Sequence, residues 1–110
     1  KKIMYKLKYL PLAQKDLRDI INHIADNLKA PKAAMDLLDA FDKSMLRLQQ
    51  FPYSCKVYQP IEPLEAEYRM LSVKNYLIFY TVTEDVVEIQ RIFYAKMDIE
   101  NLINHGLEKP

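Results

Sequence analysis

The chain has 110 residues, half of them apolar, and its 16 Lys and Arg residues nearly balance 15 Asp and Glu residues, leaving a net charge of +1. This length fits one globular domain with one core, over residues 1–110. The small net charge excludes a strong attraction of the whole molecule to nucleic acid, so any basic site must be local. A single glycine, Gly106, excludes a glycine-rich phosphate loop, and a single cysteine, Cys55, excludes an internal disulfide.

Membrane and metal chemistry have little support in the sequence. No apolar run approaches the roughly 20 residues of a membrane span, and no signal-peptide pattern is found, so a reducing cytoplasm is the expected compartment. His23, His105 and Cys55 do not have the spacing of metal ligands. We therefore expect no metal, no cofactor and no membrane partner.

The first half of the chain predicts a strand followed by two helices. Apolar and polar residues alternate over residues 3–9, which is typical of a half-buried strand. From Pro11, apolar residues recur at intervals of three and four through Leu28, and a second such stripe runs from Pro31 to Phe51. Two helices joined by a short link should pair as an antiparallel hairpin. The apolar positions of the two stripes are Ala13, Leu17, Ile20, Ile21, Ile24, Leu28, Met35, Leu38, Phe41, Met45 and Leu48.

The second half predicts a three-stranded antiparallel meander. Residues 53–67 contain two prolines and no clear period, which indicates an ordered loop. Residues 98–104 are expected to form a short helix or a docked tail. The expected strands are residues 68–73, 76–83 and 86–94, with two-residue turns at Lys74-Asn75 and Glu84-Asp85. This order predicts an α+β fold in which the helical hairpin covers one face of the sheet.

The middle strand of the meander is apolar on both faces. Residues 76–80 read Tyr-Leu-Ile-Phe-Tyr, without the alternation of a half-exposed strand. The strand is therefore predicted to be central, with its outer face at least partly covered, and a partner is one source of that cover.

Basic residues in or beside the predicted sheet are the first candidates for a binding site: Arg69, Lys74, Arg91 and Lys96. A basic concavity is what a phosphate backbone requires, although Lys and Arg on a meander are usually solvated. Arg91 has the same parity as Val87, Ile89 and Phe93, so we favour the interpretation that it is partly buried and paired to a carboxylate.

Tyrosines and acids give weaker signals. Tyr76 and Tyr80 are expected in the core, whereas packing and a site role are evenly balanced for Tyr94, at the end of the last strand. Asp16 and Asp19 lie three apart and are predicted on the solvated face of the first helix.

Three segments, in this order, carry a family resemblance: YKLKYLPLAQKDLRDIINHIADN, LRLQQFP and YRMLSVKNYLIFYTVTEDVVEIQRIFYAKMDIENLI. From Tyr5 to Ile103 the chain resembles the RelE/ParE superfamily of bacterial toxins from type II toxin–antitoxin modules. The resemblance implies a small toxin that arrests growth until a cognate antitoxin neutralises it. RelE-like members cleave mRNA on the ribosome, with Arg and Lys holding the phosphate and a Tyr, His or Glu acting as base. ParE-like members inhibit DNA gyrase and lack that set.

The nuclease pattern is incomplete in this chain. The family motif in the central strand is Tyr followed by Arg, whereas Tyr76 is followed by Leu77. The arginine expected near the end of the last strand aligns with Met97, and the tyrosine of the tail aligns near Ile103. Each lost arginine removes a bidentate donor to the developing phosphorane charge, worth about 3–4 kcal/mol in comparable electrostatic sites.

The resemblance therefore supports two mechanisms. The first is a toxin that binds a protein target such as gyrase and is covered by its antitoxin through strand addition or a docked helix. The alternative is a metal-independent mRNA endoribonuclease acting on the ribosome, with Arg69, Tyr94 and Lys96 as candidate catalytic residues and Lys74 and Arg91 as candidate binding residues. A third hypothesis is a toxin-fold protein that has lost its toxicity.

Overall fold

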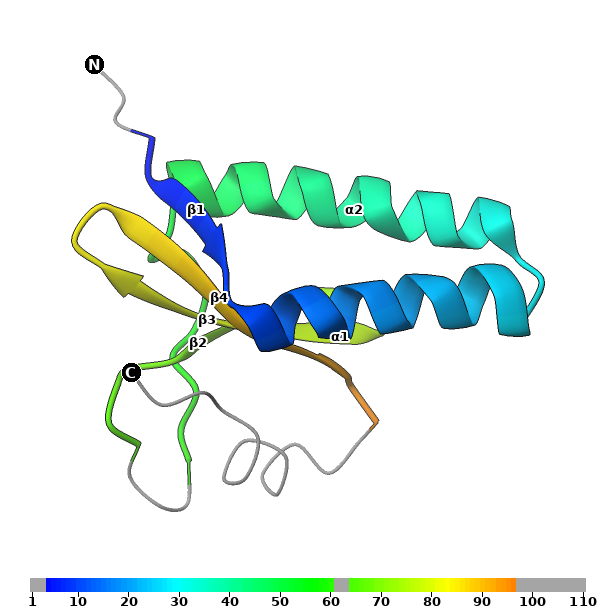
Figure 1. Ribbon diagram of the computed structural model, residues 1–110. Coiled ribbons are helices and arrows are strands. Elements are labelled where there is room, and N and C mark those ends of the chain that lie inside the picture. Colours follow the sequence, from blue (N-terminus) through cyan, green and yellow to red (C-terminus); the bar gives the residue numbers. More distant parts are fainter. Residues whose placement is uncertain (1–3, 61–63, 97–110) are drawn as a thin grey trace.

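The computed structural model describes residues 4–60 and 64–96 and shows two helices side by side on one face of a four-stranded sheet (Figure 1). The predicted α+β fold, with a strand, a helical hairpin and an antiparallel meander in that order, is confirmed. The expected terminal helix or tail at residues 98–104 lies outside the described residues. The elements are β1 (Lys6–Tyr9), α1 (Pro11–Asn22), the π-helix η1 (His23–Asn27), α2 (Pro31–Gln50), β2 (Arg69–Val73), β3 (Tyr76–Thr83) and β4 (Val86–Tyr94).

The sheet has the strand order β1-β4-β3-β2. Strand β1 pairs with β4 in parallel, with Lys6 opposite Val86 and Tyr9 opposite Ile89, whereas the other strands pair antiparallel. The position of β1 is not predicted by the sequence, because alternation indicates a strand and not its neighbour. As expected, β3 is a central strand, flanked by β4 and β2.

The helical hairpin begins and turns at residues with a specific backbone role. Pro11 and Pro31 open α1 and α2, where a missing amide hydrogen leaves no helical bond unmade. At the end of η1 the Leu28 amide donates to the His23 carbonyl at 3.0 Å, and Lys29 turns the chain with a φ of 51°. Leu28 and Met35 of the predicted apolar stripes are 60% and 58% exposed, contrary to a core position. They lie near the tip of the hairpin, which extends past the sheet (Figure 1).

The main core lies between the helices and the sheet. Tyr5, Leu7 and Tyr9 pack against it at the period of two predicted for the first strand. Its most deeply buried large side chains are Phe41, Leu48, Ile78, Tyr80, Val87 and Ile89. Of the two tyrosines predicted in the core, Tyr80 is fully buried and Tyr76 packs against the core while partly exposed.

A smaller cluster covers part of the opposite sheet face. Phe79 and Phe93 form its buried centre, with Tyr58 and Leu64 of the loop packed against them. The Tyr58 and Phe79 rings meet edge to face, with centroids 5.3 Å apart. The chain itself therefore supplies some of the cover predicted for the outer face of β3.

A β-bulge in β4 changes which residues share a face. Tyr80 is opposite Ile89 and Phe79 is opposite Arg91, so Gln90 is an extra residue. Val87 and Ile89 face the helices, whereas Arg91 and Phe93 lie on the opposite face, because the bulge interrupts the period of two. The parity that grouped Arg91 with Val87 and Ile89 is therefore wrong.

Within the described residues, neither helix combines the length and apolarity needed to cross a membrane.

Candidate functional site

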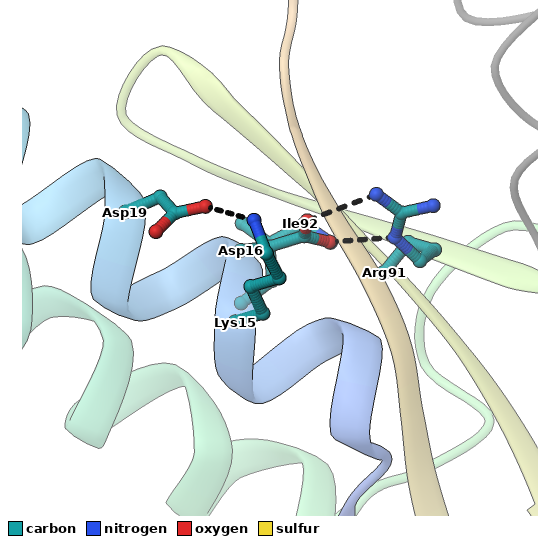
Figure 2. Close-up of polar contacts among 5 residues, drawn as sticks. All are labelled: Lys15, Asp16, Asp19, Arg91 and Ile92. Carbon is teal, nitrogen blue, oxygen red and sulfur yellow. Dashed lines mark hydrogen bonds and ion pairs between the residues drawn. The ribbon is translucent and has the colours of Figure 1, made fainter.

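Arg91, a candidate binding residue, is held by Asp16 of α1. Its Nε donates to Asp16 Oδ2 at 2.7 Å and its Nη2 donates to Oδ1 at 2.9 Å (Figure 2). Both side chains are only 15% exposed, and the guanidinium carbon lies 4.8 Å from the centre of the Phe93 ring. This geometry is the carboxylate pairing that the sequence favoured for Arg91.

Asp16 also completes the open edge of β4. Strand β1 ends at Tyr9, so β4 has no neighbouring strand on that side beyond Ile89. The Ile92 amide donates instead to Asp16 Oδ2 at 3.0 Å (Figure 2). The prediction that Asp16 is solvated is wrong, because α1 crosses this edge and its carboxylate accepts the bond that a strand would accept. Asp19 is exposed as predicted and pairs with Lys15 at 2.7 Å.

Arg69, a candidate catalytic residue, donates hydrogen bonds to the loop after α2. Its Nη1 donates to the Cys55 carbonyl at 2.7 Å and its Nη2 to Glu67 at 3.2 Å. Its guanidinium carbon lies 5.0 Å from the centre of the Tyr53 ring. A phosphate at Arg69 would have to compete with these contacts.

The three candidate catalytic residues do not share one site. Arg69 begins β2 and is opposite Tyr80, in the middle of β3, whereas Tyr94 is opposite Tyr76, at the start of β3. Tyr76 and Tyr80 lie four residues apart along β3, which corresponds to about 13 Å in an extended strand. Lys96 follows Tyr94 by two residues, so the structure groups Tyr94 with Lys96 and places Arg69 elsewhere.

Tyr94 and Lys74 instead line a groove between the helical hairpin and the β2–β3 turn. The groove has a volume of about 780 Å³. Lys74 occupies the turn with a φ of 52°, a conformation that is costly for a residue with a Cβ atom. The Tyr94 ring packs on the Tyr76 ring with centroids 5.7 Å apart. Burial, and then the nearby Tyr94, raise the pKa of Tyr76.

Apolar side chains form most of this groove, which we call the hairpin groove. They come from α1, η1, the link and α2: Ile20, Ile24, Leu28, Ala33 and Leu37. Asp19 and His23 add polar groups, and the His23 ring contacts the Asn27 amide at 3.1 Å. A long apolar groove with a few charges is suited to a protein segment.

Leu77, which stands where the nuclease motif has an arginine, also has apolar surroundings in the structure. Leu77 packs against the cluster of Phe79 and Phe93 on the sheet face opposite the helices. Met97 and Ile103 lie outside the described residues. Residues 4–60 and 64–96 contain no group of three or more His, Cys, Asp or Glu side chains placed to hold a metal ion.

Two polar residues with structural importance were missed by the sequence analysis. Gln90 gave no signal, because a bulge cannot be recognised from alternation in a single sequence. Tyr80 was predicted only as a core residue, yet its hydroxyl donates to the Pro52 carbonyl at 2.8 Å. Burial and a hydrogen bond with Cys55 raise the pKa of Tyr80.

Solved structures of other proteins share this fold. A chain of the chromosomal ParDE toxin–antitoxin system from P. aeruginosa has a TM-score of 0.66 and 21% identity, covering 84% of this chain and 98% of that chain. A chain of the RelBE2 toxin–antitoxin complex from Mycobacterium tuberculosis has a TM-score of 0.58 and 16% identity, covering 87% and 98%. A chain of the archaeal RelE–RelB complex from Pyrococcus horikoshii OT3 has a TM-score of 0.57 and 17% identity, covering 86% and 98%. No curated protein matches the sequence significantly.

The strand order and the helical hairpin thus define a RelE/ParE-like fold. Residues 7–99 match the family described as ParE toxin of type II toxin-antitoxin system, parDE. The chain belongs to the ParE toxin family, and the resemblance found in its sequence is confirmed.

Proposed function

We propose that this ParE-family toxin arrests growth by binding a protein target, with DNA gyrase as the first candidate. The observation that carries the proposal is the separation of Arg69 from Tyr94 and Lys96, together with the apolar setting of Leu77. A nuclease site needs its phosphate-binding cation and its base within reach of one phosphodiester. Protein binding needs only a complementary surface, which the hairpin groove supports.

We further propose that a cognate antitoxin neutralises the toxin by seating an amphipathic helix in the hairpin groove. Ile24 and Leu28 supply apolar surface on one wall, and Tyr94 supplies an aromatic ring on the other. Tyrosine is common among residues that dominate binding energy, because it combines a large apolar area with a polar tip. The structures from M. tuberculosis and P. horikoshii are complexes with antitoxins, which supports this type of partner.

Strand addition at β2 is a second contact available to the same antitoxin. Strand β2 is at the edge of the sheet, and on its outer side the Met70 amide donates to the Lys56 carbonyl at 3.2 Å. The alternation of an extended strand then directs the Ser72 amide and carbonyl outward. Within the described chain no backbone bond to Ser72 is found on that side, so an added strand would find these groups available.

The target is tested by combining two assays on the wild-type protein. Purified toxin is added to a supercoiling assay with the gyrase of its own organism, and mRNA from cells after induction is mapped by primer extension. Inhibition of supercoiling without cleavage is expected. Cleavage at codon-defined positions without inhibition would refute the proposal in favour of a ribosome-dependent nuclease.

The antitoxin interface is tested with two matched charge insertions. Leu28, in the link before α2, lines the hairpin groove, whereas Leu46 lies on α2 outside this groove, and both leucines are more than half exposed. We expect Leu28→Asp to weaken binding of the small protein encoded by the adjacent reading frame by at least about 30-fold, the usual effect of a central interface residue. Leu46→Asp should bind normally. Equal affinities of the two variants would exclude the groove as the main interface.

The nuclease alternative rests on one observation, the presence of Lys74, Tyr94 and Lys96 at the same end of the sheet. Lys74 and Tyr94 line one groove, and Lys96 follows in the chain. If primer extension detects cleavage, Tyr94→Phe should abolish it while leaving antitoxin binding intact. A chain with neither cleavage nor gyrase inhibition nor growth arrest would be a ParE-family protein that has lost its toxicity.

A further inference from the structure

A second cavity lies on the sheet face away from the helices and plays no part in the proposals above. Its volume is about 400 Å³, and it lies over the part of the sheet where Lys8, Glu88 and Thr81 stand side by side on three strands. The loop around Tyr68 forms one wall. This volume is much larger than the roughly 30 Å³ that one water molecule occupies in the liquid.

The floor of the cavity holds a buried polar group with an unused acceptor. Gln90 and Thr81 line it and are only 7% and 6% exposed. Gln90 Nε2 donates to Thr81 Oγ1 at 3.2 Å, whereas Gln90 Oε1 has no hydrogen-bond partner among the residues that the structure describes. Buried carbonyl oxygens nearly always have a donor, and the broad terminal torsion of glutamine allows a small rotation toward the cavity. Alternation along β4 places Gln90 on the same face as Glu88, two residues before it, because Val87 and Ile89 face the helices.

Two acidic and two basic side chains line the cavity: Glu67, Glu88, Lys8 and Arg69. Glu88 lines it, and Glu65 and Glu88 are both close enough to add to the effect of burial in raising the pKa of Tyr68. Arg69 also lines it, but its guanidinium is committed to Glu67 and to loop carbonyls. Lys8 stands opposite Glu88 in the strand register, but among the described residues the two side chains form no ion pair, so the Glu88 carboxylate is available to a second cation.

We propose that this cavity binds the guanidinium group of an arginine side chain presented by a partner protein. A guanidinium is a planar set of donors, and it would join the Glu88 carboxylate to the unused Gln90 oxygen. Leu10 and Val82 provide apolar wall for the methylene stem of the same side chain. The inference does not depend on the identity of the target or on the hairpin groove.

The test is an NMR titration of the full chain with N-acetyl-arginine amide, with N-acetyl-citrulline amide as a neutral control of similar shape. The expected result is saturable shifts of the Gln90 side-chain amide and of the Thr81 and Glu88 backbone amides with the arginine compound alone. Equal shifts with both compounds, or no shift at Gln90, would overturn the proposal. A water molecule bonded to Gln90 Oε1 and retained throughout the titration would do the same.

Three substitutions separate recognition from a general charge effect. Glu88→Gln should weaken binding of the arginine compound by at least about tenfold, since hydrogen bonds to charged groups are the strong ones. Lys8→Gln should tighten it, because the competing cation is removed, and Glu84→Gln in the β3–β4 turn should leave it unchanged. If Lys8→Gln or Glu84→Gln weakens binding as much as Glu88→Gln does, the assigned geometry is wrong. Circular dichroism of each variant verifies that it folds.

Discussion

Removing the charge of Asp16 should destabilise the protein far more than removing that of Asp19, three residues away on the same helix. Asp16→Asn keeps the size of the side chain but leaves the Arg91 guanidinium, 15% exposed, without its carboxylate. The Ile92 amide retains an acceptor in the amide oxygen of the new side chain. Asp19 is 59% exposed, and its one ion pair within the described part of the chain is with Lys15.

The size of the expected loss in unfolding free energy follows from the three hydrogen bonds that Asp16 accepts, at 2.7, 2.9 and 3.0 Å. Breaking a buried ion pair by removing one partner costs about 3–5 kcal/mol, and partial exposure with a retained Ile92 bond reduces this to about 2–3 kcal/mol for Asp16→Asn. Asp16→Ala, which loses every bond, should reach about 3–5 kcal/mol. Asp19→Asn should cost less than about 0.5 kcal/mol, as is usual for exposed pairs.

Urea unfolding followed by circular dichroism measures these differences, and hydrogen exchange of the Ile92 amide reports the local effect. A double-mutant cycle with Asp16→Asn and Arg91→Met isolates the pair, and we expect a coupling of about 1.5–3 kcal/mol. The reasoning is refuted if Asp16→Asn is as stable as Asp19→Asn. It is equally refuted if the two changes in the cycle are additive.

Two further predictions concern alkaline pH and the turns. Burial and then Asp42 raise the pKa of Tyr9 to about 12, so the folded state holds this proton more tightly than the unfolded chain does. The contribution of Tyr9 to stability should therefore be fully present below about pH 10 and be lost between about pH 10 and 12. Tyr9→Phe should reduce the fall in unfolding free energy over this range, measured by urea titrations at several pH values; an unchanged slope would contradict the assignment. Glu84 has a φ of 53° in the β3–β4 turn, so Glu84→Gly should raise the unfolding free energy by up to about 1 kcal/mol. The matched change Asp85→Gly, at a residue outside the positive-φ region, should lower it, and the opposite order would exclude backbone strain at Glu84.

Local patterns were sufficient for the helices, the strands and their turns. The alternation of β1, the apolar stripes after Pro11 and Pro31, and the doubly apolar run of β3 each depend on backbone periods that neighbouring residues share. The resemblance of the ordered segments to RelE/ParE toxins also lay in the sequence, and the match over residues 7–99 confirms it.

Side-chain partners across the fold were decided by tertiary structure. Asp16 and Asp19 look alike in the sequence, and only the crossing of α1 over β4 brings Asp16 to Arg91, 75 residues away. The bulge at Gln90 reverses the faces of the residues that follow it, which alternation alone cannot indicate. Arg69 and Tyr94 both belong to the meander, yet the antiparallel register places them opposite residues of β3 that lie four positions apart, Tyr80 and Tyr76. The sequence by itself thus determined the elements and the family, because these depend on local periodicity and on ordered motifs. Only the packed sheet and helices decided which charges are buried and which candidate residues meet.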